Sequence, residues 1–109
     1  MSQASLFRGG FDLAAAEGNT EAIQALLQKG AKVNATNNNG WTALMIAALN
    51  GHTEIVSLLI DRGADINNKN NHGYNALMAA AQNGHTETVS VLIDCGADIN
   101  NKNNDGNNV

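Results

Sequence analysis

Residues 40–67 read GWTALMIAALNGHTEIVSLLIDRGADIN and contain two short apolar segments, each followed by a glycine. The first segment, about Thr42–Asn50, is apolar on nearly every side and rich in alanine, which predicts a helix buried on more than one face. The second, about Thr53–Asp61, has a wide apolar stripe and a polar side, which predicts an amphipathic helix. Gly51 and Gly63 suit the positive φ that commonly ends a helix. The stretch therefore predicts a helix-turn-helix unit.

A polar connection follows these two segments. Residues 64–73, ADINNKNNHG, are polar apart from Ala64 and Ile66 and end with the composition of a tight turn. We expect a hairpin-like connection that projects from the helices. Three evenly spaced asparagine clusters predict three such connections, because asparagine tolerates left-handed backbone and forms Asx-turns. A disordered low-complexity tract is disfavoured, since apolar periodic segments separate the clusters.

The unit recurs along the chain at an offset of 33 residues. Residues 40–72 and 73–105 agree at 25 of 33 positions, and residues 7–39 agree with 40–72 at 11 of 33. A fixed period of this length indicates a solenoid of stacked units. We therefore expect a single domain over residues 1–109 with three repeats over those ranges, the first cap-like and only approximately bounded, and the start of a further turn at 106–109.

The quoted stretch resembles the ankyrin repeat. Residues 73–100 match the same pattern, and residues 14–34, AAAEGNTEAIQALLQKGAKVN, match a degenerate first copy. The resemblance covers nearly the whole chain. It implies an all-α fold of stacked antiparallel helix pairs, with hairpin-like loops that project at about a right angle.

One departure from the family pattern lies at the start of the first helix of each repeat. The family's T-P-L-H is T-A-L-M at Thr42–Met45 and N-A-L-M at Asn75–Met78. Alanine lacks the preset φ of proline but favours helix. The methionines cannot make the hydrogen bond that the resemblance assigns to histidine between neighbouring repeats. We therefore expect a normal fold with fewer polar bonds between repeats.

A second departure lies in the first copy, where Gly9 and Gly10 fall inside the expected helix. Two glycines cost about 2 kcal/mol relative to alanine if a helix includes them. We therefore expect this helix to start near Phe11 or Asp12.

Composition excludes several classes of protein. Six Lys and Arg against ten Asp and Glu, with no basic run, do not give the charge pattern of a nucleic-acid binder. The longest largely apolar stretch, Trp41 to Gly51, is too short to span a bilayer, and the first ten residues lack the apolar core of a secretory signal. The single cysteine, Cys95, excludes an internal disulfide and fits a reducing compartment. We expect a cytoplasmic protein that binds neither nucleic acid nor membrane.

No residue pattern indicates catalysis. His52–Glu54 and His85–Glu87 both read H-x-E, as in zinc deaminases, but the chain has no proline and so lacks their P-C-x-x-C segment. The motif also recurs at the repeat period, which indicates a structural role. Stacked helices lie about 8–10 Å apart, too far for equivalent histidines to share one ion. We expect no catalytic residue, metal site or cofactor, an unreactive exposed thiol at Cys95, and a chain that is not an enzyme.

The resemblance implies that a partner protein binds the hairpin tips and the first-helix side of the stack, which is the concave face. Carried over by position, the candidate residues are Asn38, Asn39, Trp41, Leu49, Asn50, Asn71, His72, Tyr74, Gln82 and Asn83, with Arg8, Ala16 and Glu17 as first-unit counterparts. Trp41 and Tyr74 have two open interpretations. They anchor a partner, as large aromatics often do, or they pack on the stem of the hairpin.

The sequence thus predicts a protein-interaction module. Two alternatives stay open: a structural segment of a longer array, or an engineered scaffold, whose functional site lies elsewhere; and an enzyme or regulatory domain with catalytic sequence outside residues 1–109. We expect a monomer, because end units need a wetter outer face and the third unit replaces apolar residues of the second with Ala79, Gln82, Thr88 and Val91.

Overall fold

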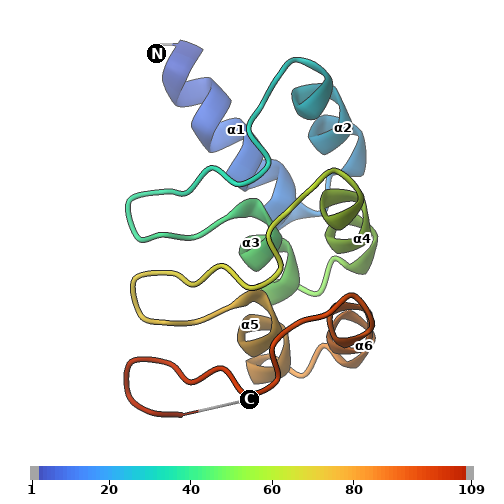
Figure 1. The fold of residues 1–109 in the computed structure, drawn as a ribbon. Coiled ribbons are helices and arrows are strands. Elements are labelled where there is room, and N and C mark those ends of the chain that lie inside the picture. The colour runs from blue at the N-terminus through green and yellow to red at the C-terminus, as the bar shows by residue number, and fades with distance from the viewer. Residues whose placement is uncertain (1–2, 108–109) are drawn as a thin grey trace.

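A computed structural model of the chain describes residues 3–107, and the side chains of residues 10–107. Helices occur in three successive pairs, which we number units one to three (Figure 1). The helices within the described range are α1 (Gln3–Glu17), α2 (Thr20–Gln28), α3 (Ala43–Leu49), α4 (Thr53–Asp61), α5 (Ala76–Gln82) and α6 (Thr86–Asp94). No strand forms between residues 3 and 107, although an isolated antiparallel bridge joins Thr36 to Thr42. The all-α class is confirmed. The further turn was expected at 106–109, and residues 108 and 109 of it lie outside the described range.

The units stack in one direction and their loops project to one side. In Figure 1, α1, α3 and α5 form one column, α2, α4 and α6 form a second, and the three long loops extend from the side of the first column. α3 packs against both α1 and α5, while α4 packs against α2 and α6. The stack is elongated, with extents of 39 × 25 × 21 Å. The first-helix column and the loops therefore lie on the same side of the molecule.

Polar side chains start the first helices of units two and three. Thr42 Oγ1 accepts a hydrogen bond from the Met45 amide at 3.3 Å, and Asn75 Oδ1 accepts one from the Met78 amide at 2.9 Å. Each satisfies one of the amides that a helix start leaves without an intrahelical partner. Thr42 and Asn75 are therefore the N-caps of α3 and α5.

Gly51 ends α3 and permits the close approach of the next unit. Its φ is 72°, in the left-handed region, and its amide bonds to the carbonyl of Ala48. A Cβ added at this position would lie 2.5 Å from Nδ1 of His85. Both the backbone conformation and the neighbouring ring therefore exclude a side chain.

The expected start of the first helix was wrong. α1 begins at Gln3 and runs through Gly9 and Gly10. Phe11, Ala14 and Ala15 in its second half are buried in the core and hold that half as helix. Once a helix is nucleated, each further residue adds one hydrogen bond, so extension tolerates residues of poor propensity. The packed half thus offsets the glycine cost that the sequence suggested.

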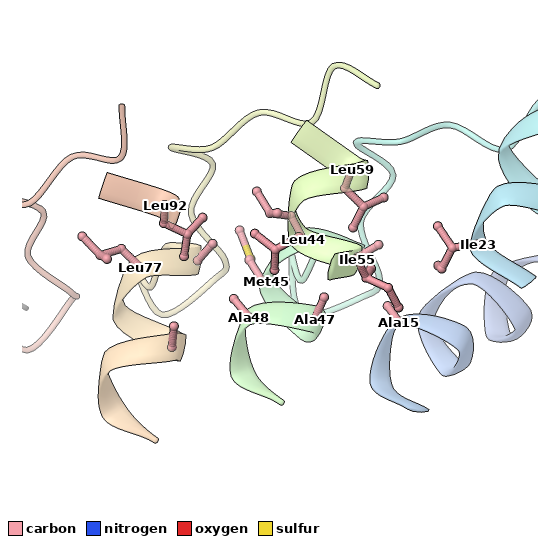
Figure 2. Close-up of a cluster of buried hydrophobic side chains, with 14 of the residues drawn as sticks. Ala15, Ile23, Leu44, Met45, Ala47, Ala48, Ile55, Leu59, Leu77 and Leu92 are labelled. Carbon is pink, nitrogen blue, oxygen red and sulfur yellow. The ribbon is translucent and has the colours of Figure 1, made fainter. Parts of the chain in front are cut away.

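Alanine allows the units to approach one another closely. Ala43, Ala47 and Ala48 on α3 are completely buried. Figure 2 shows Leu and Ile side chains from the second helices reaching toward this alanine-rich column. The largest fully buried apolar side chains are Ile23, Leu44, Met45, Ile55, Leu59, Leu77, Leu92 and Val56. Met45 and Met78 are both buried, so they contribute apolar packing in place of the family's histidine.

The end-capping interpretation of the third unit was partly wrong. Ala79 and Thr88 are each only 1% exposed, so neither lies on an outer face. Thr88 instead lies within 2.7 Å, hydroxyl to hydroxyl, of Thr53 in the preceding unit. Thr88 thus replaces apolar packing with an inter-unit hydrogen bond. Gln82 is exposed, as expected.

Candidate interaction surface

One asparagine closes the tip of each projecting loop. Asn37 Oδ1 accepts hydrogen bonds from the amides of Asn39 at 2.9 Å and Trp41 at 3.0 Å. Asn70 and Asn103 accept the corresponding pairs in the next two loops. Backbone bonds across each loop complete the closure, for example from the Asn37 amide to the Trp41 carbonyl at 3.0 Å. The tips are therefore fixed in shape by their own side chains.

A second set of asparagines joins each tip to the one before it. The Asn71 amide donates to the Asn39 carbonyl at 3.0 Å, and its side-chain Nδ2 donates to the Asn38 carbonyl at 3.2 Å. Asn104 donates in the same way to the carbonyls of His72 and Asn71, each at 2.9 Å. We call these bonds the tip ladder. The ladder makes one continuous surface of Asn38, Asn39, Asn71 and His72, all of which are exposed.

Trp41 and Tyr74 follow the tips in equivalent backbone positions but differ in packing. Both are half-buried, and the amide of each donates to the asparagine that closes its loop. Trp41 packs against the apolar core, whereas the core cluster of residues 10–107 does not include Tyr74. Packing within the fold and anchoring of a partner are therefore separable roles, and Tyr74 contributes less to packing than Trp41 does.

The candidates at the helix ends form a second, separate group. Asn83 Nδ2 donates to the carbonyl of Leu49 at 2.8 Å, which joins units two and three. Asn50 Nδ2 donates to the Ile46 carbonyl at 2.9 Å within its own unit. Gln82 is exposed, and Leu49 is half-buried. Asn50 and Asn83 thus complete helix ends, while Leu49 and Gln82 present side chains at the end of the first-helix column.

The first-unit counterparts Ala16 and Glu17 likewise separate into a residue bonded through its backbone and a residue with an exposed side chain. Ala16 is half-buried, and Glu17 is exposed. The carbonyl of Ala16 accepts a hydrogen bond from Nε2 of His52 at 2.8 Å. Arg8 lies on α1, in the part whose side chains lie outside the described residues.

Polar bonding between units is extensive, contrary to the expectation drawn from the methionines. His52 and His85 each donate Nε2 to a carbonyl at the end of the preceding first helix, at 2.8 and 2.9 Å. Asn34 bridges the next unit, where its Oδ1 accepts from the Asp65 amide at 2.7 Å and its Nδ2 donates to the Gly63 carbonyl at 3.2 Å. Asn67 makes the same two bonds, to the Asp98 amide and the Gly96 carbonyl, and the tip ladder adds further bonds between units. Histidines and asparagines outside the T-P-L-H position therefore take over the bonding.

The histidines of the H-x-E motifs take part in contacts between units. Each occupies the N-cap position of a second helix without a side-chain capping bond, and its Nε2 bonds a backbone carbonyl of the preceding unit. Across the part of the chain that the structure describes, no three His, Cys, Asp or Glu side chains gather as a metal ion would require. Cys95 is free and exposed. In the same part, no helix is long and apolar enough to cross a bilayer.

The fold and the repeated contacts between units define a solenoid of stacked helix pairs. A family model described as ankyrin repeats matches residues 11–103 in three copies. The chain therefore belongs to the ankyrin-repeat family. No curated protein matches the chain at a significant level. Ankyrin repeats generally bind other proteins, and the family is typically non-enzymatic.

The sequence did not show that different asparagines have different structural roles. Asn70 and Asn103 are 6% and 8% exposed and organise the tips, whereas Asn71 and Asn104 link them. The 33-residue recurrence of these positions was a signal that could have separated structural from free asparagines. The side-chain amides of Asn71 and Asn83 are engaged within the protein, so they offer a partner less than their composition suggested.

Proposed function

We propose that the chain is a protein-interaction module whose partner binds across the tips and the concave side of the first-helix column. The observation that supports this most is the tip ladder, which holds exposed side chains of successive units in one preset arrangement. A surface that is fixed before binding loses less conformational freedom when the partner arrives. The closed tips and buried first helices add to that rigidity.

Within this proposal Tyr74 and the exposed end of the column are the principal contacts. Tyr74 is half-buried and its amide bonds Asn70, the asparagine that closes the tip. Tyrosine is frequent among the residues that contribute most to binding at interfaces. Gln82 and Leu49 differ between otherwise similar units, which suits a variable contact on a constant frame. Asn38 and Asn71 form the rim and contribute less. Trp41 contributes both to binding and to the stability of its own unit.

The proposed module is monomeric, non-enzymatic and located in a reducing compartment such as the cytoplasm. The single cysteine supports the compartment. The absence of any cofactor requirement is part of the same proposal, because the side chains of His52 and His85 are engaged in contacts between units. The partner is a protein, neither nucleic acid nor lipid, since the net charge is −4.

A matched pair of surface variants tests the proposal. Gln82 and Ser90 are both exposed polar residues of unit three, on α5 and α6 respectively. Partners captured by the intact protein from cell extract are compared with those captured by Gln82→Arg and Ser90→Arg. We expect Gln82→Arg to lose the specific partner and Ser90→Arg to retain it. Loss with Ser90→Arg alone would place the binding surface on the second helices and refute the proposal.

A further inference from the structure

Gly40 in the first tip occupies a position that accepts only glycine. Its φ is 82°, in the left-handed region. A Cβ added there would lie 2.7 Å from Oδ1 and 3.0 Å from the amide nitrogen of Asn71, the residue that forms the tip ladder between units one and two. The ladder therefore requires glycine at this position, whatever residue precedes it.

The residue before this glycine differs among the three tips. It is Asn39 in the first, His72 in the second and Asp105 in the third, and each precedes a glycine of positive φ. Asparagine before glycine is chemically labile, because glycine has no side chain to hinder attack of its backbone nitrogen on the asparagine amide. His72 has no side-chain carbonyl, and Asp105 already carries the carboxyl group that the reaction produces. The first tip is therefore the one in which the required glycine creates a reactive pair.

Two other asparagines precede glycine, but hydrogen bonds hold their side chains. Asn50 and Asn83 each donate Nδ2 to a backbone carbonyl, at 2.9 and 2.8 Å. Asn39 is exposed, and among the described residues its hydrogen bonds are those of its backbone amide and carbonyl. The Gly40 amide donates to the Asn37 carbonyl at 3.0 Å, so attack needs a brief opening of the tip. Exposed loops open locally at low free energy.

We propose that Asn39 is a site of spontaneous self-modification that opens the tip ladder between units one and two. The Gly40 nitrogen attacks Cγ of Asn39 and forms a new C–N bond. The bond from Cγ to Nδ2 breaks, and the side-chain nitrogen leaves as ammonia with the proton of the Gly40 amide. Water then adds to one of the two carbonyl carbons of the resulting cyclic succinimide and opens the ring. One opening gives aspartate and the other gives isoaspartate, and water is the only other reactant.

The aspartate product keeps the tip as it is. Its backbone is unchanged, and the third tip shows that a carboxyl group is accommodated at this position. The Asp105 amide donates to Asn103 Oδ1 at 2.9 Å, as the Asn39 amide donates to Asn37 Oδ1 at 2.9 Å. Aspartate at residue 39 therefore adds one negative charge to an otherwise unaltered tip.

The isoaspartate product breaks both the closure of the tip and the ladder. It routes the chain through Cβ and Cγ, which adds one methylene to the backbone between residues 39 and 40. Asn37 Oδ1 accepts from the amides of residues 39 and 41, which flank the altered linkage, so the longer chain moves these donors apart. The former carbonyl of residue 39, which accepts from the Asn71 amide at 3.0 Å, becomes a carboxylate outside the chain. The first tip is then no longer fixed to the second.

Opening of the ladder divides the candidate interaction surface. Asn38 and the modified residue 39 no longer hold a preset position relative to Asn71 and His72, so partner binding should weaken as the chain ages. This consequence rests on the proposed function, whereas the modification and the opening of the ladder do not.

The test is ageing of the intact chain under mild alkaline conditions, separation of the modified fraction, and measurement of amide hydrogen exchange by NMR. We expect isoaspartate at residue 39 in peptide maps. In that fraction the Asn71 amide should exchange about tenfold faster, as loss of one hydrogen bond predicts. The Asn104 amide, which donates to the His72 carbonyl at 2.9 Å in the next tip, is the internal control and should keep its exchange rate.

Two results of this experiment would overturn the proposal. One is an Asn71 amide that is as well protected in the isoaspartate fraction as in the fresh chain. The other is an Asn39 that stays intact in the folded chain under conditions in which it reacts in the chain unfolded by urea.

Two variants copy the residues that the other tips carry and serve as matched controls. Freshly prepared Asn39→Asp is the aspartate product alone, and Asn39→His reproduces the second tip and cannot form the succinimide. We expect both to keep the Asn71 exchange rate of the fresh parent, Asn39→His even after ageing. Faster exchange in either would overturn the proposal, because added charge or general ageing would then explain the opening. Full affinity of the isoaspartate fraction for the captured partner, with a fast-exchanging Asn71 amide, would refute the proposed function and leave the modification established.

Discussion

Replacing His52 by alanine should destabilise the protein more than the same change at His85. Both rings donate Nε2 to the end of the preceding first helix, at 2.8 and 2.9 Å. The acceptors differ in their other partners. The Leu49 carbonyl also accepts from Asn83 at 2.8 Å, whereas among the described residues only His52 donates a side-chain bond to the Ala16 carbonyl.

The magnitude follows from those two environments. A hydrogen bond of this kind contributes about 1 kcal/mol, and a partly buried carbonyl left without a partner costs about a further 1 kcal/mol. We therefore expect His52→Ala to lower the free energy of unfolding by about 2 kcal/mol and His85→Ala by about 1 kcal/mol. For a chain of this size these losses correspond to about 8 °C and 4 °C in melting temperature.

Thermal melting followed by circular dichroism measures both variants beside the parent protein. Adding Asn83→Ala to His85→Ala removes the second donor, so the double variant should lose as much stability as His52→Ala. A His85→Ala variant as unstable as His52→Ala, with no further loss on adding Asn83→Ala, would refute the reasoning that the asparagine provides a second partner.

Three further outcomes are expected. Burial raises the pKa of the Asp12 carboxyl above its ordinary 3.8. The folded chain therefore binds the carboxyl proton more tightly than the unfolded chain, and stability falls as pH rises above 3.8 and Asp12 ionises. Asp12→Asn should melt higher than the parent at pH 7, and this gain should vanish below pH 3.8. Gly51→Ala should destabilise far more than Gly84→Ala, although both have φ of 72°, because only at Gly51 would the added Cβ lie 2.5 Å from a ring; equal losses in urea unfolding would contradict this. Asn39 should deamidate before Asn83, whose side chain is held by a hydrogen bond at 2.8 Å; peptide mapping after mild alkaline ageing that found the reverse order would contradict it.

The repeat and the helices were predictable because both leave periodic signals. The 33-residue recurrence, the alanine-rich first segment and the striped second segment predicted α3 and α4 to within a residue at either end. The caps at Thr42 and Asn75 agree with residue type and position, because threonine and asparagine are favoured directly before a helix. The first helix was mispredicted because glycine propensity is a local quantity, whereas the burial of Phe11 is a tertiary one.

The bonds between units were not predictable from the family pattern alone. Loss of histidine at Met45 and Met78 suggested weaker polar bonding, but His52 and Asn34 make such bonds from elsewhere in the repeat. Sequence showed that asparagines recur, yet their roles depend on which atoms meet across the stack. The burial of Thr88 could not be predicted from the sequence either, because its hydrogen-bond partner Thr53 lies 35 residues away. The candidate interaction residues stay a prediction, because the sequence places them only through the family resemblance.

The affinity of Tyr74→Ala for the captured partner tests the central claim most directly, because Tyr74 is the aromatic that lies outside the core cluster of residues 10–107. Titration calorimetry and thermal melting are run on the variant beside the parent, with Ser90→Arg as the control on the opposite helix. We predict an affinity loss of about 2 kcal/mol, roughly thirtyfold, with a melting temperature close to that of the parent. Unchanged affinity with a large fall in melting temperature would contradict it.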